Sequence, residues 1–325
     1  MTIQCLIFIS ILLLLSSVLF VKSIDATHAT TPLVSTRDHF YIFNGYLALG
    51  HTYSDYESPQ VIPICLPDRE IVIYVHGWNA DEESAISQFK IVKKSLESPE
   101  IDYRHPVIGF SWDSNTIGFY PWNWLIGKSI AEQNGLKLGK FILDYKEYCE
   151  QAKIRLVGHS LGASVILNAL ERLHNDPELS LWNAPDRNYK VESVHLLGAA
   201  VNPEDVSIRN GFGIYIRDEV NQNEFHNKFS PQDDTLETAY RDTEGHIALG
   251  ENGAGNILTG LSSYYQEENV SNAISRDVNG NGIIDRNDKP NLGDNHMGYA
   301  GVVNSNNGQL TSNGAMDEVV LDWRN

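Results

Sequence analysis

The segment "KIRLVGHSLGASVILNALERLH" (Lys153–His174) is the feature that most restricts how this chain can fold. A β-branched, apolar run ends at Gly158, and apolar residues spaced three and four apart begin directly after Gly162. The first pattern predicts a buried strand and the second predicts an amphipathic helix. A strand that passes so abruptly into a helix is typical of parallel sheets covered by helices.

The same alternation extends along much of the chain and predicts the α/β class, with a mostly parallel central sheet and helices on both faces. Two further apolar runs, at residues 40–49 and 61–65, predict edge strands, and the polar residues 25–38 predict a loose lead-in. Beyond Asn202 the pattern changes to loops rich in Asn, Asp and Gly, without a second domain. The other strands are predicted within residues 70–79, 105–112 and 189–201, and the helices within 81–97, 126–149 and 163–174.

Ser160 stands at the junction of the central strand and its helix, in the pattern G-x-S-x-G of residues 158–162. The turn is so tight that Ser160 must adopt strained backbone angles, while Gly158 and Gly162 let neighbouring elements pass close by. The hydroxyl is then left exposed above the sheet, so we predict that Ser160 is a catalytic nucleophile. The alternative is that Ser160 caps the helix, a role that would not require both glycines.

A serine that transfers acyl groups needs backbone N–H groups to bind the oxyanion. One donor is expected from Leu161, which follows the serine at the start of its helix. The other is expected from Trp78, because "YVHGWNA" (Tyr74–Ala80) follows an earlier central strand and Gly77 gives that loop a flexible turn. The side chain of His76 is expected to pack this loop rather than to take part in catalysis.

With these motifs the chain resembles the α/β-hydrolase superfamily, and within it the lipase-like branch. The resemblance rests on "VHGW" at residues 75–78, "GHSLGAS" at residues 158–164 and the later strand "SVHLLGAAV" at residues 193–201. It covers roughly Tyr41 to Asp234 at the level of the fold. The resemblance implies an α/β-hydrolase fold, an ester-cleaving activity, and catalytic residues in the order serine, acid, histidine.

The resemblance also implies an acid in "EFHNKFSPQDDTLE", where aspartates follow a Ser-Pro turn. We predict Asp233, with Asp234 as the second choice. Asp205 is the other candidate, since some lipases place their acid directly after the preceding strand. The acid would orient the histidine and stabilise its imidazolium form. The competing interpretation is that Asp233 and Asp234 are solvated turn residues.

Two histidines lie downstream of Asp233, namely His246 in "TEGHIALG" and His296 in "GDNHMGYAG". The triad histidine of the family typically lies on a loop near the C-terminal end of the fold, so we predict His296 as the general base and His246 as the second choice. Both are flanked by glycine, and each could equally be a simple loop residue.

A metal-binding pattern precedes His296. Residues 277–288, "DVNGNGIIDRND", resemble the calcium loop of EF-hands and especially of dockerins, and Gly282 allows the sharp turn. The flanks do not predict two helices, so we expect an isolated structural calcium loop that stiffens the segment presenting His296. The alternative is a solvated turn, and no organic cofactor is expected. The expected ligands are Asp277, Asn279, Asn281, the carbonyl of Ile283, Asp285 and Asp288.

The N-terminus predicts export. Residues 6–21 form an uncharged run interrupted only by serines, which is short for a membrane span and typical of a secretory signal. We therefore assign residues 1–23 to the signal and residues 24–325 to the hydrolase domain. No Lys or Arg precedes the run, so an uncleaved anchor is the competing interpretation. In an oxidising compartment Cys65 and Cys149 could pair, but their spacing does not decide this.

The net charge of −18 argues against nucleic acid as a partner, because phosphate binding needs clustered Lys and Arg. The sequence therefore predicts a secreted or extracytoplasmic serine hydrolase that cleaves carboxylic esters of small molecules or lipids. Membrane contact is expected only through an uncleaved N-terminal segment. The rival hypothesis is a non-catalytic, calcium-stabilised surface or secreted protein that keeps the fold and binds a partner.

Overall fold

The computed structural model describes most of the chain, and all described residues belong to one compact unit, Thr31–Asn325. The predicted signal at residues 1–23 and the predicted calcium loop at residues 277–288 lie outside the described residues. Across the described part, no helix combines the length and apolar character needed to span a membrane. The described residues are 32–58, 65, 69–209, 211–255, 261–274, 294–303 and 309–324.

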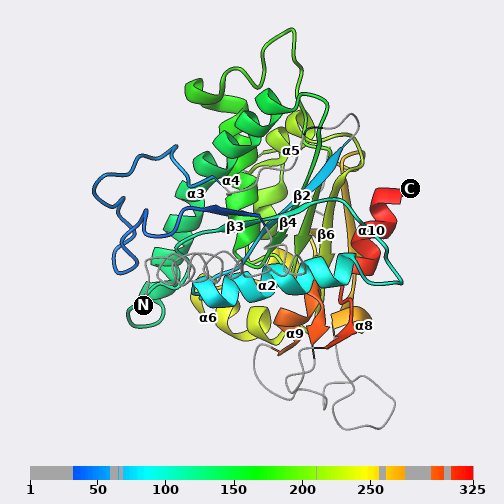
Figure 1. Ribbon diagram of the computed structural model, residues 1–325. Coiled ribbons are helices and arrows are strands. Elements are labelled where there is room, and N and C mark those ends of the chain that lie inside the picture. Colours follow the sequence, from blue (N-terminus) through cyan, green and yellow to red (C-terminus); the bar gives the residue numbers. More distant parts are fainter. Residues whose placement is uncertain are drawn as a thin grey trace, which may run out of the picture. The chain divides into compact units, whose positions relative to one another are not determined.

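A seven-stranded sheet in the order β1-β3-β2-β4-β5-β6-β7 forms the centre of this unit (Figure 1). Every neighbouring pair in the sheet runs parallel, which confirms the predicted α/β class. A separate antiparallel ladder joins β8 (Val302–Val303) to β9 (Leu310–Ser312). The strands of the sheet are β1 Leu33–Ser35, β2 Glu70–Val75, β3 Val107–Ser111, β4 Lys153–His159, β5 Ser193–Leu197, β6 Phe225–Phe229 and β7 Tyr265–Asn269.

Helices cover both faces of the sheet, as predicted. On one face α3 and α4 share a core with the strands, and on the other face α2 and α10 do so. The α-helices are α2 Glu82–Leu96, α3 Trp122–Tyr148, α4 Gly162–Asn175, α5 Gly213–Glu219, α6 Arg241–Glu244, α7 Leu249–Asn252, α8 Ser271–Ile274, α9 Asp294–Met297 and α10 Met316–Arg324. Short helical turns of other types are η1 Pro177–Leu179, η2 Pro203–Val206, η3 Leu236–Tyr240 and η6 Gly298–Ala300.

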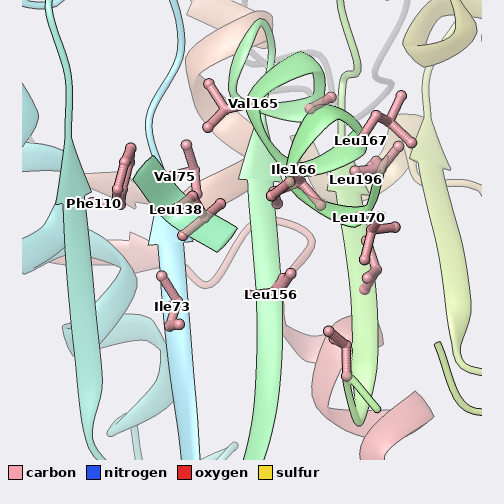
Figure 2. Close-up of a cluster of buried hydrophobic side chains, with 14 of the residues drawn as sticks. Ile73, Val75, Phe110, Leu138, Leu156, Val165, Ile166, Leu167, Leu170 and Leu196 are labelled. Carbon is pink, nitrogen blue, oxygen red and sulfur yellow. The ribbon is translucent and has the colours of Figure 1, made fainter. Parts of the chain in front are cut away.

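Strand β2 shows how the sheet divides the core into two layers. Ile73 and Val75 belong to the layer of α3 and α4, and Figure 2 shows them in one cluster with Leu138 of α3 and the apolar side chains of α4. Val72 and Tyr74 belong to the opposite layer, where Tyr74 meets Phe89 of α2 edge to face at 6.0 Å. Because side chains alternate along a strand, an unbroken apolar run requires cover on both faces.

The edge strand predicted at residues 40–49 is wrong. These residues form turns, with one isolated bridge between Phe40 and Leu47. The edge strand is instead β1, which lies inside the predicted lead-in 25–38 and pairs with β3. The apolar residues of 40–49 are largely exposed, so their pattern did not arise from a sheet face.

The remaining expectations at the chain level have mixed outcomes. Of the second predicted edge strand, residues 61–64 lie outside the described residues, and Cys65 is not in a strand. The loops expected after Asn202 are interrupted by β6 and β7, which extend the sheet. Cys65 and Cys149 form a disulfide, which ties the segment before β2 to the end of α3.

Candidate active site

Ser160 occupies the turn between β4 and α4 in a strained backbone conformation. Its φ is +54°, in the left-handed region that residues other than glycine rarely adopt. The two glycines are needed for close approach. A Cβ on Gly158 would lie 2.7 Å from Ile166 Cδ1, and a Cβ on Gly162 would lie 2.4 Å from the carbonyl oxygen of Val75. The local sequence thus produces the tight strand-to-helix turn that the motif predicts.

Backbone hydrogen bonds fix Ser160 from the neighbouring strand. Its N–H donates to the Leu197 carbonyl at 3.0 Å, and its own carbonyl accepts from the Ala200 N–H at 3.1 Å. The hydroxyl has no hydrogen-bond partner within the described part of the chain. The N-cap of α4 is Leu161, and no side chain caps the helix. Ser160 is therefore not a helix cap, but the residue is buried, with 6% of its surface exposed, so the prediction of an exposed hydroxyl is wrong.

The two predicted oxyanion donors lie next to this serine. Leu161 follows it at the start of α4, and the loop after β2 passes so close that a Cβ on Gly77 would lie 2.8 Å from the Ser160 Cβ. Neither the Leu161 N–H nor the Trp78 N–H donates to an acceptor among the described residues. Open N–H groups beside a serine hydroxyl are what stabilisation of an oxyanion requires.

The loop that carries Trp78 is held by His76 and Arg37. His76 is fully buried; its Nδ1 donates to the Gly77 carbonyl at 2.8 Å, and its Nε2 accepts from the Trp112 N–H at 3.1 Å. The Arg37 guanidinium lies 3.2 Å from the same Nε2. Burial, and then the Arg37 charge, keep the pKa of His76 well below its ordinary value. The neutral ring therefore packs and orients the loop, in line with the expectation for His76.

The structure brings His296 and Asp233 together across 63 residues of sequence. His296 Nδ1 lies 2.7 Å from Asp233 Oδ2. Asp233 is fully buried after β6, and its Oδ1 accepts from the Leu236 N–H at 3.0 Å. A carboxylate can only accept, so Nδ1 carries the proton and Nε2 is left as the basic nitrogen. This is the tautomer that a general base needs.

His159 and Tyr299 surround the pair. His159 Nε2 donates to the backbone carbonyl of His296 at 2.7 Å, and the two rings lie 4.7 Å apart. Burial lowers the pKa of His159 to about 3, so the ring stays neutral. Tyr299 is fully buried, and burial followed by the Asp233 carboxylate raises its pKa well above the ordinary value. Because His159 directly precedes Ser160, this bond ties the His296 backbone to the turn that carries Ser160.

The second-choice residues occupy other positions. Asp205 accepts from the Asn202 N–H at 2.9 Å and completes a capping box on the short turn η2. His246 Nε2 lies 3.2 Å from the side-chain nitrogen Nδ2 of Asn202. His246 and Asp205 line the same cavity. Asp234 is buried, and its backbone carbonyl accepts from Thr238 Oγ1 at 2.6 Å. Neither carboxylate lies where Asp233 meets the imidazole of His296.

A cavity of about 380 Å³ opens beside Leu161, between α3, α4 and the segment after β5. Burial raises the pKa of two of its carboxyl groups, those of Glu132 and Asp205. Leu161, the residue after Ser160, lines this cavity, whereas Ser160 and His296 do not. Its charged and titratable lining residues are Lys128, Glu132, Asp205, Glu244 and His246.

In two places, His and Asp side chains lie close enough together to bind one metal ion. In each place, however, the buried ammonium group of a lysine already contacts the aspartate. Lys137 Nζ lies 2.5 Å from Asp55 Oδ1, and Lys228 Nζ lies 2.7 Å from Asp322 Oδ2. A lysine therefore supplies the positive charge at each site, and we assign no metal to them. All predicted calcium ligands lie outside the described residues. The clusters are His39, His51 and Asp55, and His195, His226 and Asp322.

Two contributors to the site are not predicted from the sequence. His159 is the variable residue of the motif, although its position next to Ser160 is a usable signal. Arg37 lies in the predicted lead-in and contacts His76 and Ala80, in the loop that carries Trp78. No pattern in the sequence around Arg37 predicts these contacts. A serine hydroxyl, open N–H groups and an imidazole oriented by a carboxylate are the kinds of group that acyl transfer uses, and His159 links the imidazole-bearing residue to the Ser160 turn.

A family model matches more than half of the chain. Residues 64–251 match the family described as alpha/beta hydrolase of unknown function (DUF900). Among curated proteins, none matches the sequence.

Solved structures give only distant likenesses. An acetylxylan esterase is 14% identical, with 42% of this chain and 65% of that chain covered and a TM-score of 0.27. A cutinase-like protein from Cryptococcus sp. is 13% identical, with coverages of 78% and 93% and a TM-score of 0.33. A gene product of Listeria innocua is 16% identical, with coverages of 62% and 84% and a TM-score of 0.36. At these values, nothing about activity or substrate transfers from these proteins.

Proposed function

Since the chain belongs to the DUF900 family of α/β hydrolases, we propose that it is an exported serine hydrolase that cleaves carboxylic esters. The observation that supports the proposal is the buried Asp233–His296 pair, which His159 links to the turn that carries Ser160. The strained serine, the open N–H groups and the buried carboxylate of Asp233 all follow the carboxyl ends of strands in one parallel sheet, and His296 of α9 meets that carboxylate. In open parallel sheets this edge is where ligands bind.

The proposed reaction uses these groups in turn. Ser160 Oγ attacks the ester carbonyl while His296 Nε2 takes the hydroxyl proton, and Asp233 stabilises the imidazolium. The N–H groups of Trp78 and Leu161 hold the negative oxygen of the tetrahedral intermediate. His296 then gives its proton to the departing alcohol, which leaves an acyl group on Ser160. Water activated by His296 releases the acid and restores the serine.

Export and calcium binding are further parts of this proposal. Export is supported by the apolar run at residues 6–21 and by the disulfide between Cys65 and Cys149, since disulfides persist in oxidising compartments. Calcium is supported by the oxygen-ligand spacing of residues 277–288, six positions before α9, which carries His296. Bound calcium would stiffen the segment that presents His296 to the nucleophile.

Labelling with a fluorophosphonate probe tests the serine and the calcium together. The full chain in calcium should label, Ser160→Ala should not, and Ser129→Ala, an exposed serine on α3, should label normally. Removal of calcium with EDTA should slow labelling while the far-UV circular dichroism stays unchanged.

Two results would count against the proposal. If the wild-type chain does not label in the presence of calcium, the enzyme assignment fails, and a non-catalytic, calcium-stabilised binding protein becomes the better description. If EDTA changes neither the labelling rate nor the thermal midpoint, the calcium assignment alone is lost.

A further inference from the structure

One surface exposes far more large apolar side chains than the rest of the described chain. Of the 16 large hydrophobic side chains that are exposed there, ten fall in residues 41–53 and 117–125. Leu49 is 91% exposed and Phe119 is 87% exposed, so these side chains hardly touch the molecule. We call this set the aromatic rim. Its members are Tyr41, Phe43, Tyr46, Leu49, Tyr53, Ile117, Phe119, Tyr120, Trp122 and Leu125.

The two segments of the aromatic rim form one surface. The Ile117 N–H donates to the Ile42 carbonyl at 3.1 Å, which joins them directly. Gln133 of α3 donates to the Gly45 carbonyl at 3.1 Å, so the first segment also rests on the helix that continues the second. In Figure 1 the blue segment that contains residues 41–53 accordingly lies beside α3.

The aromatic rim lacks charge as well as cover. Residues 41–53 and 117–125 contain no Asp, Glu, Lys or Arg and a single histidine, His51, although 20% of the whole chain is charged. Large exposed apolar surfaces are rare on soluble proteins and mark interaction sites. Trp and Tyr combine an apolar ring with a polar tip, which suits the boundary between lipid chains and water. The composition therefore favours a lipid surface over a charged polymer.

The aromatic rim is attached to the wall of the candidate active site. Trp78, the predicted oxyanion donor, donates from Nε1 to Thr116 Oγ1 at 2.8 Å, directly before Ile117. The Trp78 ring also meets the Trp124 ring at 5.3 Å, two positions after Trp122. A lipid layer that covered the rim would therefore lie close to the loop that carries Trp78.

We propose that the aromatic rim binds the surface of a neutral lipid layer and that the ester attacked by Ser160 comes from this layer. The layer is uncharged or zwitterionic because the chain carries a net charge of −18 and the rim has no Lys or Arg to attract anionic headgroups. The source of the ester rests on the proposed function, whereas the binding of the layer does not.

Sedimentation with phosphatidylcholine vesicles tests the binding without turnover when the full chain carries Ser160→Ala. In this parent, the double change Phe119→Ser and Trp122→Ser removes rings that are 87% and 67% exposed, so little packing is lost. It should lower the vesicle partition coefficient at least about tenfold, because two rings no longer enter the lipid. Leu181→Ser removes an exposed leucine outside the rim and should bind like the parent.

Several outcomes overturn the proposal. One is a parent that does not bind vesicles, or a rim variant that binds as well as the Leu181 control. Another is tighter binding to phosphatidylglycerol than to phosphatidylcholine vesicles, which would make the attraction ionic. A third is a parent that is dimeric in ultracentrifugation and monomeric in the rim variant, since a second copy would then be the occupant.

An activity measurement separates this inference from the proposed function. With Ser160 restored, the rim variant should cleave a dissolved short-chain ester normally and lose about tenfold on the same acyl ester carried in vesicles. Equal losses on both substrates would mean that the rim acts on the active site itself, which overturns the proposal. If vesicles bind but no ester is cleaved, the enzyme assignment fails while the lipid surface stands.

Discussion

At the scale of single residues, the choice of acid depends on which carboxylate meets an imidazole. Asp233 Oδ2 lies 2.7 Å from His296 Nδ1, whereas Asp205 accepts from a backbone N–H in a capping box. Both are aspartates in loops that follow strands, and the sequence left them as alternatives. The two aspartates differ in the group that their carboxylates meet, which is an imidazole for Asp233 and a backbone N–H for Asp205.

Asp233→Asn should lower kcat for a chromogenic ester by about 10³–10⁴-fold, because an amide does not hold the imidazole tautomer with the proton on Nδ1. Asp205→Asn is the matched control and should keep kcat within a few-fold, since its partner is the Asn202 backbone. Initial rates at saturating substrate measure both variants. A larger loss for Asp205→Asn would show that the acid is wrongly assigned.

At the scale of elements, helix α3 holds the N-terminal segment 32–58 through several side chains, of which Lys137 is the buried cation. Lys137 has no exposed side-chain surface, and its ammonium group donates to Asp55 Oδ1 at 2.5 Å and to the Asp55 carbonyl at 3.0 Å. Burial opposes the ionised form of Asp55, but hydrogen bonds from Lys137 and His51 lower its pKa to about 2. The segment held in this way also carries Arg37, which contacts His76 and the Ala80 carbonyl on either side of Trp78.

Asp55→Asn should lower the free energy of unfolding by about 2 kcal/mol, because a buried ammonium group loses its charge partner. The value lies below that of a fully buried pair because the Asp55 side chain is 36% exposed. Glu97→Gln, which breaks the exposed pair with Lys93, should cost under about 1 kcal/mol. Urea unfolding at pH 7 compares the two variants, and equal losses would contradict a structural role for the Lys137 pair.

At the scale of the whole molecule, several histidines are buried in the neutral form. Burial lowers the pKa of His195 to about 3 and that of His226 to about 4, and it also lowers that of His159 to about 3. His195 and His226 stack under α10 and both meet Asp322 at 3.1 Å. Their position beneath the C-terminal helix couples protonation to the packing of that helix on the sheet.

Stability should therefore fall as the pH drops below about 6.5, the pKa of histidine in an unfolded chain. The folded pKa values are lower, so the unfolded state binds more protons between pH 6.5 and about 4, and each such histidine contributes up to about 1.4 kcal/mol per pH unit. Urea unfolding at pH 7.5 and 5.5 should differ by at least about 3 kcal/mol, and His226→Asn should reduce that difference. Equal stability at the two pH values would contradict the neutral burial of these residues.

The sequence by itself determined the local features of this protein. The turn at Ser160 follows from the sterics of Gly158 and Gly162 within a few residues, and the parallel sheet follows from strand and helix periods that alternate along the chain. These features depend on neighbours in sequence, so the order of the residues is enough to predict them. The class of the fold and the strained turn at Ser160 belong to this group.

Only the tertiary structure decided which distant residues meet. Asp233 and His296 are 63 positions apart, and their contact joins the loop after β6 to α9. The edge strand β1, the support from Arg37 and the aromatic rim likewise result from packing between segments that carry no mutual pattern. An apolar run such as residues 40–49 has the same pattern whether it pairs in a sheet or remains exposed, because period alone does not specify a partner.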